Sequence, residues 1–181
     1  DVHARFEPIS KYDSSCSAES NAKGECFGGY ARLMTAVTQA RARTNNSLLL
    51  DGGDQFQGSL YFAYYNGKAA AEMMNRLRYD AMAVGNHEFD DGPDVLREFM
   101  DRVSFPVLMA NADVSKEPAL RDFQKKSDIL SVGGQKIGLI GITPEGNHVL
   151  ASPGKNIIFT APAKAVQAEV DKLTKAGINK I

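Results

Sequence analysis

The sequence has 181 residues, of which 43% are hydrophobic and 24% are charged, so it is long enough for one domain with a hydrophobic core. Lys and Arg together number 21 and Asp and Glu 22, which gives a formal net charge of −1. The basic stripe expected of a protein that binds a nucleic acid polymer is not visible in the sequence. A run of about 18 apolar residues, which a transmembrane helix requires, is also not visible.

Two cysteines, Cys16 and Cys26, bracket a polar, loop-like stretch over residues 17–25. We expect a disulfide between them, which would stabilise the fold by about 2–3 kcal/mol in the chain-entropy model. Two free thiols or a metal-binding pair are the alternatives. The long spacing, with no His between the two cysteines, disfavours the metal pair. A disulfide would indicate an oxidising compartment such as the periplasm or the cell exterior.

Helical and strand-like segments alternate through the next part of the chain. Apolar residues at helical spacing predict helices over residues 30–43 and 68–77. Short apolar runs at residues 47–50 and 81–84 are typical of buried strands. Each of these two strands leads directly into a turn rich in Gly, Asp or Asn.

A third helix is predicted from Pro93 to about residue 103, because proline favours the first turn of a helix. Residues 106–110 are typical of another buried strand. Residues 111–127 have the least regular pattern, and we expect them to form a surface excursion.

The C-terminal third predicts a hairpin and one more helix. Residues 129–132 and 136–142 flank a Gly-Gly pair, which indicates two antiparallel strands. Residues 161–176 predict a helix, and residues 178–181 the beginning of a strand. Strands alternating with helices predict a layered α/β fold, and the hairpin favours a mixed sheet over a purely parallel one.

Three short segments place polar donor groups at the ends of strands. These are residues 1–3 (Asp-Val-His), residues 51–58 (Asp-Gly-Gly-Asp-Gln-Phe-Gln-Gly) and residues 85–90 (Gly-Asn-His-Glu-Phe-Asp). In open α/β sheets, ligands bind at the carboxyl ends of the strands, so the three segments are expected to converge on one site. Each segment alone has an ordinary explanation as a turn or a chance match. Their shared layout favours a site.

The donor groups suit a divalent metal ion. Asp carboxylates, His imidazoles and Asn amide oxygens are ligands for ions such as Zn²⁺ or Mn²⁺. Asp1 and His3 are two residues apart, and on an extended segment both would face the same ion. Glycines beside Asp54 and Asn86 allow tight turns. A carboxylate between two ions can bridge them, and Asp54 is the candidate.

The three segments resemble successive motifs of the calcineurin-like metallophosphoesterases. Longer runs, at residues 51–59, 77–83 and 85–90, resemble the 5′-nucleotidase family within this group. The cysteine-bracketed loop followed by residues 28–33 (Gly-Gly-Tyr-Ala-Arg-Leu) is similar to animal ecto-5′-nucleotidases and to exported bacterial relatives. The resemblance covers essentially the whole chain.

This resemblance implies a four-layer αββα sandwich with mixed sheets. Residues 1–181 would form an incomplete, N-terminal part of that catalytic domain. It also implies two divalent metal ions, Zn²⁺, Mn²⁺ or similar. By position, Asp1 and His3 would hold the first ion and Asn86 the second, and Asp54 would bridge both.

The resemblance also implies a dyad of His87 and Asp90. The His would stabilise the phosphoryl-transfer state or protonate the leaving oxygen, and the Asp would orient the His. A His three residues from a carboxylate is physically suited to both roles. His148, the remaining histidine, lies in a loop-like stretch, and we interpret it as a solvated side chain.

The implied reaction is the two-metal hydrolysis of nucleoside 5′-monophosphates to nucleoside and phosphate by a metal-activated water. A small nucleotide is therefore the expected partner. The alternatives within the family are hydrolysis of nucleoside di- and triphosphates, UDP-sugars or 2′,3′-cyclic nucleotides, and a thiosulfohydrolase. Outside it, the alternatives are a metal-free binding protein with the same fold and a structural domain whose motifs are coincidental.

Part of the family's pattern has no counterpart in these 181 residues. The later His motifs and the C-terminal substrate-binding domain are not found, so we expect this chain alone to be inactive. The sequence opens within a metal motif and shows no signal peptide, and we interpret both ends as missing. From the disulfide and the resemblance, we expect a periplasmic, extracellular or cell-surface protein.

Overall fold

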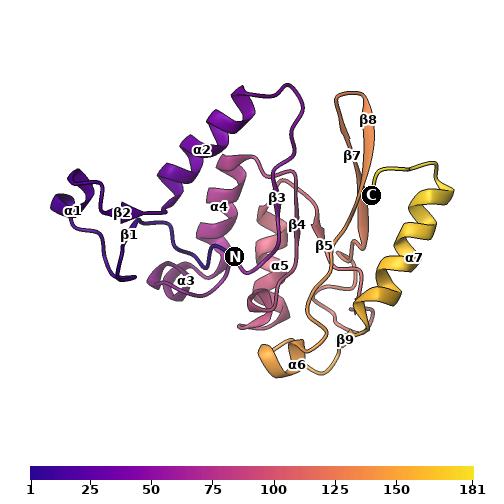
Figure 1. Cartoon of the computed structure of the whole chain (residues 1–181). Helices are drawn as coiled ribbons and strands as arrows, with labels where there is room; N and C mark the ends of the chain where they lie inside the picture. The colour runs from indigo at the N-terminus through magenta and orange to yellow at the C-terminus, as the bar shows by residue number, and fades with distance from the viewer.

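The structure is a computed structural model that describes residues 1–181, and it alternates short strands with helices (Figure 1). The helices are α1 (Ala18–Ala22), α2 (Tyr30–Ala42), α3 (Leu60–Tyr65), α4 (Gly67–Leu77), the 3₁₀ helix η1 (His87–Phe89), α5 (Pro93–Arg102), α6 (Asn147–Leu150) and α7 (Pro162–Lys175). The strands are β1 (Ile9–Ser10), β2 (Cys26–Phe27), β3 (Leu50–Asp51), β4 (Ala81–Ala83), β5 (Val107–Leu108), β6 (Ala112–Asp113), β7 (Ser127–Val132), β8 (Gln135–Ile140) and β9 (Ile158–Phe159). The structure contains no helix of the length and apolar character needed to cross a membrane.

A parallel sheet in the order β3–β4–β5 forms the centre of the molecule. Leu50 pairs with Ala81, and Met82 pairs with Val107. Because β3 and β4 are parallel, both end at the same edge of the sheet. The segments that follow them, residues 52–58 and 85–90, therefore emerge side by side.

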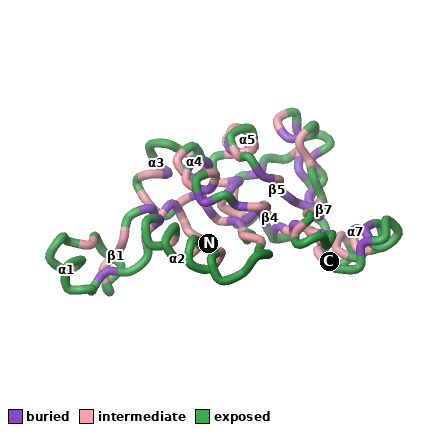
Figure 2. The backbone as a smooth tube through the Cα atoms, turned by 90° about the horizontal axis from the view of Figure 1, so that it is seen from above, coloured by how far each residue is buried: buried purple, intermediate pink, exposed green.

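Helices α4 and α5 pack against each other beside this sheet (Figures 1 and 2). The spacing of the apolar residues of α4 predicts one buried face, and Ala70, Met74 and Leu77 are buried as expected. On α5, Leu96 and Phe99 are buried. The hydrophobic core lies between these helices and the sheet.

The hairpin of β7 and β8 forms as predicted and extends the structure beyond β5. The N–H of Met109 donates to the carbonyl of Lys125 at 2.9 Å, and the N–H of Ala110 donates to that of Gly141 at 2.7 Å. Parallel pairing is confined to the central sheet, whereas the three two-stranded sheets are antiparallel. The strand expected over residues 178–181 is not formed.

The prediction of a surface excursion over residues 111–127 is wrong for residues 111–120. Asn111, Ala112, Val114 and Leu120 are each at most 1% exposed. Exposed polar residues separate the buried positions, so the sequence of this segment shows no regular pattern. Residues 111–120 therefore contribute to the core, whereas residues 121–127 include no buried residue.

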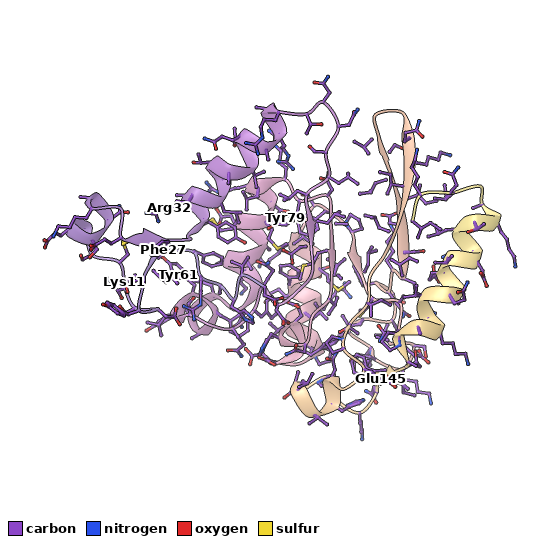
Figure 3. All side chains as sticks on the ribbon, viewed as in Figure 1. Lys11, Phe27, Arg32, Tyr61, Tyr79 and Glu145 are labelled. Carbon is purple, nitrogen blue, oxygen red and sulfur yellow. A yellow bond between two sulfur atoms is a disulfide. The ribbon has the colours of Figure 1, made fainter.

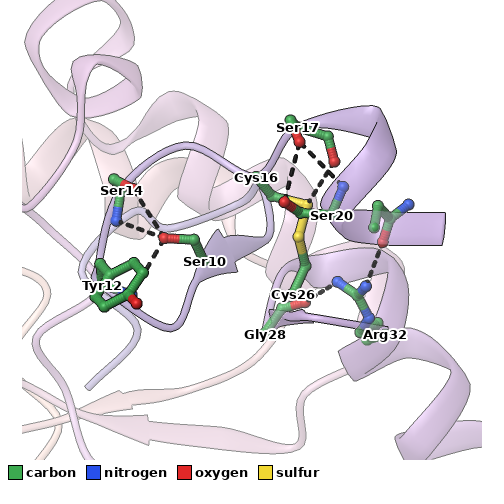
Figure 4. The surroundings of a disulfide bond; sticks show 10 residues. Ser10, Tyr12, Ser14, Cys16, Ser17, Ser20, Cys26, Gly28 and Arg32 are labelled. Carbon is green, nitrogen blue, oxygen red and sulfur yellow. Dashed lines mark hydrogen bonds between the residues drawn. A yellow bond between two sulfur atoms is a disulfide. The ribbon is translucent and has the colours of Figure 1, made fainter. Parts of the chain in front are cut away.

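Residues 9–28 form an arm that projects from the body of the molecule (Figures 1 and 3). Lys11 and Phe27, both in this arm, are labelled in Figure 3. The expected disulfide between Cys16 and Cys26 is present, with the two Cα atoms 5.8 Å apart (Figure 4). Helix α1 buries none of its residues. The arm is therefore held mainly by the disulfide and by hydrogen bonds, not by a core of its own.

Candidate metal centre

Three predicted site residues meet at the carboxyl edge of the central sheet. His3, Asp54 and His87 each place a ligand atom within 4.8 Å of the other two, and all three side chains are half-buried. They come from the N-terminal segment, from the loop after β3 and from η1 after β4. The fold thus brings together residues that are separated by more than eighty positions.

His3 is held by hydrogen bonds to the loop after β3. Its N–H donates to the carbonyl of Asp54 at 3.0 Å, and the N–H of Ala4 donates to that of Gln55 at 3.0 Å. His3 and Ala4 have φ angles of 53° and 49°, so the expectation of a simple extended segment is wrong. These backbone contacts with the loop offset the cost of the left-handed conformation.

One ring nitrogen of His3 contacts the protein backbone. Its Nδ1 lies 3.2 Å from the carbonyl oxygen of Phe56. A carbonyl can only accept a hydrogen bond, so Nδ1 is the donor in this contact, and in the neutral ring the lone pair is on Nε2. Such an arrangement is typical of a histidine that binds a metal through its other nitrogen.

Asp54 sits at the meeting point of the two loops. Its carboxylate Oδ1 accepts a hydrogen bond of 3.0 Å from the N–H of His87. Gly85 lies directly against it, because a Cβ at position 85 would overlap Oδ1 and the backbone nitrogen of Asp54. Gly53 in turn has no room for a Cβ against Gly85. The absence of two side chains lets the loops approach this closely.

Glu88, to which sequence reasoning assigned no role, joins the two loops through hydrogen bonds to their backbones. Its side chain is fully buried, and Oε2 accepts from the N–H groups of Gly85 at 2.7 Å and Asp54 at 2.9 Å. Oε1 accepts from the N–H groups of Gln55 at 2.7 Å and Phe56 at 3.3 Å. Burial raises the pKa of Glu88, and the backbone donors oppose that rise.

A second buried network supports the loop after β3. The hydroxyl of Tyr30 donates to Gln55 Oε1 at 3.0 Å, and Gln55 Nε2 donates to Asp51 Oδ2 at 2.8 Å. Asp51 Oδ1 accepts from the N–H of Gly53 at 2.9 Å. Burial raises the pKa of Asp51 and raises that of Tyr79 to about 12. Gln55 and Tyr30 were also missed, because no local pattern shows contacts across 25 residues.

His87 and Asp90 form the hydrogen-bonded pair expected of a dyad. His87 Nδ1 lies 2.7 Å from Asp90 Oδ2, which directs Nε2 away from Asp90. This hydrogen bond raises the pKa of His87, and partial burial opposes the rise. The His87 ring meets the His3 ring edge-on, with 5.1 Å between centroids.

The other predicted residues lie around this group. Asn86 is half-buried and adjoins His87 at the start of η1. Asp1 is exposed and lies outside the group of three, although it is two residues from His3. His148 is exposed, as interpreted, and its Nε2 lies 3.0 Å from the carbonyl oxygen of Ile157.

The residues present fit a divalent metal ion. Within the group, Asp54 supplies a carboxylate and His3 an imidazole, donor types that Zn²⁺ and Mn²⁺ accept. Because His3 Nδ1 contacts the Phe56 carbonyl, Nε2 is the ring nitrogen that remains to bind a metal ion. The glycines at positions 53 and 85 leave no Cβ to fill the space between the loops.

The sequence model of the calcineurin-like phosphoesterase family matches residues 1–163. The chain belongs to this family. A protein named 5′-nucleotidase from Diplobatis ommata is 45% identical over the whole of this chain, which covers 31% of that protein. The chain thus spans about a third of the length of this relative.

Two solved structures share the fold of this member of the family. The 5′-nucleotidase precursor from Thermus thermophilus is 40% identical, with a TM-score of 0.90 over 100% of this chain and 34% of its own. The NAD nucleotidase of Haemophilus influenzae is 31% identical, with a TM-score of 0.86 over 100% of this chain and 32% of its own. The predicted metallophosphoesterase fold is confirmed.

Proposed function

We propose that this chain is the N-terminal part of the catalytic domain of an enzyme that hydrolyses nucleoside 5′-monophosphates to nucleoside and phosphate. The observation that carries the proposal is the convergence of His3, Asp54 and His87 at one edge of the sheet. Membership of a phosphoesterase family supports the reaction class. The relatives named 5′-nucleotidase support the substrate.

Four residues would hold two divalent ions, Zn²⁺, Mn²⁺ or similar. Asp1 and His3 would hold one ion, Asn86 the other, and Asp54 would bridge them. Bound ions of this kind polarise phosphate oxygens and lower the pKa of water, which supplies the nucleophile. The protein's contribution is to hold the donors in place, which the bonds of Glu88 to the backbone of both loops accomplish.

His87 and Asp90 would act on the phosphate ester directly. The hydrogen bond between Nδ1 and Asp90 fixes the orientation of the His87 ring, which offers one ligand atom to the group with His3 and Asp54. From there it can donate a proton or a hydrogen bond to the oxygen on which charge develops as the ester bond breaks. Asp90 favours the protonated ring that this role requires.

The similarity to the NAD nucleotidase favours a second substrate class, the dinucleotide NAD. Both substrates place a phosphate beside a nucleoside, so the metal centre alone does not distinguish them. We propose that residues outside this chain make that distinction. The disulfide in the arm supports export to an oxidising compartment, as does the similarity to the 5′-nucleotidase precursor from Thermus thermophilus.

The test is phosphate release from AMP, with Mn²⁺ or Zn²⁺ and with a chelator, measured for this chain and for the full-length protein. We expect chelator-sensitive release by the full-length protein and none by this chain. A full-length Asp54→Asn variant is the control for metal dependence, and it should lose both activity and metal. Metal binding without release from AMP would contradict the substrate, and NAD would then be assayed.

A further inference from the structure

Thr143, in the loop after β8, and Asn147, the first residue of α6, form a buried polar chain that ends at Gly85, next to Asn86. Asn147 Nδ2 donates to Thr143 Oγ1 at 2.7 Å, and Thr143 Oγ1 donates to the carbonyl of Gly85 at 3.2 Å. Thr143 and Asn147 are both 0% exposed. Glu145, labelled in Figure 3, marks the loop between them.

The direction of these hydrogen bonds is set by chemistry. The carbonyl of Gly85 can only accept, so the Thr143 hydroxyl proton must point to it. The same hydroxyl oxygen can then accept from the Asn147 amide. The other atom of that side chain, Asn147 Oδ1, is buried with no partner. The Asn147 side chain is thus bonded only to the Thr143 hydroxyl.

Thr143 is itself held rigidly. Asn111 Oδ1 accepts from the Thr143 N–H at 3.0 Å, and Asn111 Nδ2 donates to the Thr143 carbonyl at 2.9 Å. Asn111 is 1% exposed and also donates to the carbonyl of Thr160 at 3.1 Å. The hydroxyl that reaches Gly85 is therefore mounted on a fixed backbone.

The target of this chain is the peptide unit next to a proposed metal ligand. The carbonyl of Gly85 and the nitrogen of Asn86 belong to the same planar peptide group. The N–H of Gly85 is held on the other side by Glu88 Oε2 at 2.7 Å. Holding both groups of Gly85 leaves little freedom in the direction from which the Asn86 side chain leaves the backbone.

We infer that Thr143 and Asn147 are positioning residues for the metal ion that Asn86 would hold, an inference that rests on the proposed metal centre. The Thr143 hydroxyl fixes the peptide plane of Asn86, and Asn147 fixes the hydroxyl. Outer partners that orient metal ligands typically change metal affinity by about 10–100-fold when they are removed.

The test measures Mn²⁺ affinity and stoichiometry of the full-length protein by competition with a chelating dye, together with thermal unfolding. Thr143→Val, which removes the hydroxyl but keeps the shape, should weaken binding at one site by about 10–100-fold. Thr143→Ser restores the hydroxyl and should bind like the unsubstituted protein. Thr160→Val is the control for loss of another hydroxyl that bonds to Asn111, because Thr160 is exposed and its Oγ1 donates to the Asn111 carbonyl at 3.2 Å.

Asn147→Ala removes one donor and keeps the test decisive if Thr143→Val does not fold. It should weaken Mn²⁺ binding on its own and add nothing in the Thr143→Val background, because both changes act on one hydroxyl. Unchanged Mn²⁺ affinity in Thr143→Val or in Asn147→Ala would overturn this inference, as would an equal loss of affinity in Thr160→Val. Neither outcome would contradict the proposed metal centre. Absence of Mn²⁺ binding by the unsubstituted protein would instead overturn the proposed metal centre.

Discussion

The buried carboxylate of Glu88 accepts a hydrogen bond of 2.9 Å from the backbone N–H of Asp54, 34 residues earlier in the chain. The same oxygen accepts from Gly85, and the second oxygen accepts from Gln55 and Phe56. One side chain therefore ties the backbone of the loop after β3 to the loop after β4. The relative position of Asp54 and Asn86 depends on it.

Replacing Glu88 with Gln, a side chain of nearly the same shape, should destabilise the protein. Either orientation of the amide places an NH₂ group against two backbone N–H donors, which leaves those donors buried and unpaired. We expect the free energy of unfolding to fall by about 2–4 kcal/mol. Urea denaturation followed by circular dichroism measures this change.

Glu72→Gln is the matched control for that substitution. Glu72 pairs with Arg76 on the exposed side of α4, where its side chain is 62% exposed. Exposed pairs contribute little, so the free energy of unfolding should change by less than about 1 kcal/mol. An equal loss in both variants would contradict the bridging role of Glu88.

The sequence allows the loops of the candidate site to be predicted because their chemistry is local. His87 and Asp90 are three residues apart, and their hydrogen bond needs only one turn of helix. The longer helices and the β7–β8 hairpin follow from periodicity and turn residues in the same way. These features require no knowledge of distant parts of the chain.

The features that were missed depend on distant contacts. In the sequence, Glu88 does not differ from other acidic residues, because its hydrogen-bond partners lie in a loop more than thirty residues earlier. His3 takes a left-handed φ of 53° because its backbone bonds to residue 54, which no local pattern encodes. Val114 and Leu120 are buried although polar residues surround them in the sequence.

Gly85→Ala should disturb the metal centre through steric overlap. The added Cβ would meet Asp54 Oδ1 and the Asp54 backbone nitrogen. Forcing an extra methyl group into a packed site typically costs about 1–3 kcal/mol. We expect a lower free energy of unfolding and weaker Mn²⁺ binding, measured by denaturation and by dye competition.

Gly52→Ala, one residue from Gly53 in the facing loop, provides the comparison. A Cβ at Gly52 would meet nothing within 4 Å, and its φ lies outside the left-handed region. Stability and Mn²⁺ affinity should both stay near those of the unsubstituted protein. If Gly85→Ala behaved like Gly52→Ala, close approach of the loops would not be required for metal binding.

The disulfide should act mainly on the arm. Thiol titration of the denatured, unreduced protein should find no free thiol, and reduction should release two. Reduction should also lower the free energy of unfolding by about 2–3 kcal/mol and make residues 17–25 sensitive to limited proteolysis. A Cys16→Ser, Cys26→Ser variant should not respond to reductant. Free thiols before reduction would contradict both the bond and the export proposal.

His87→Ala in the full-length protein separates the proposed dyad from the metal ligands. If His87 only stabilises charge on the leaving oxygen, turnover of AMP should fall by about 10²–10⁴-fold while metal content stays near normal. Asp90→Asn should cause a smaller loss, because the amide oxygen can still accept from His87 Nδ1. Initial rates and elemental analysis of the purified variants give the two readouts.

His148→Ala is the control, since His148 is exposed and lies outside the group of donors. It should change neither turnover nor metal content. His87 lies in the group with His3 and Asp54, so the alternative is that His87 binds a metal ion. Loss of metal from His87→Ala would make His87 a ligand, and unchanged turnover would remove it from the mechanism. Retained metal with lost turnover is the outcome that the hydrogen bond to Asp90 predicts, because that bond orients His87 and favours its protonated form.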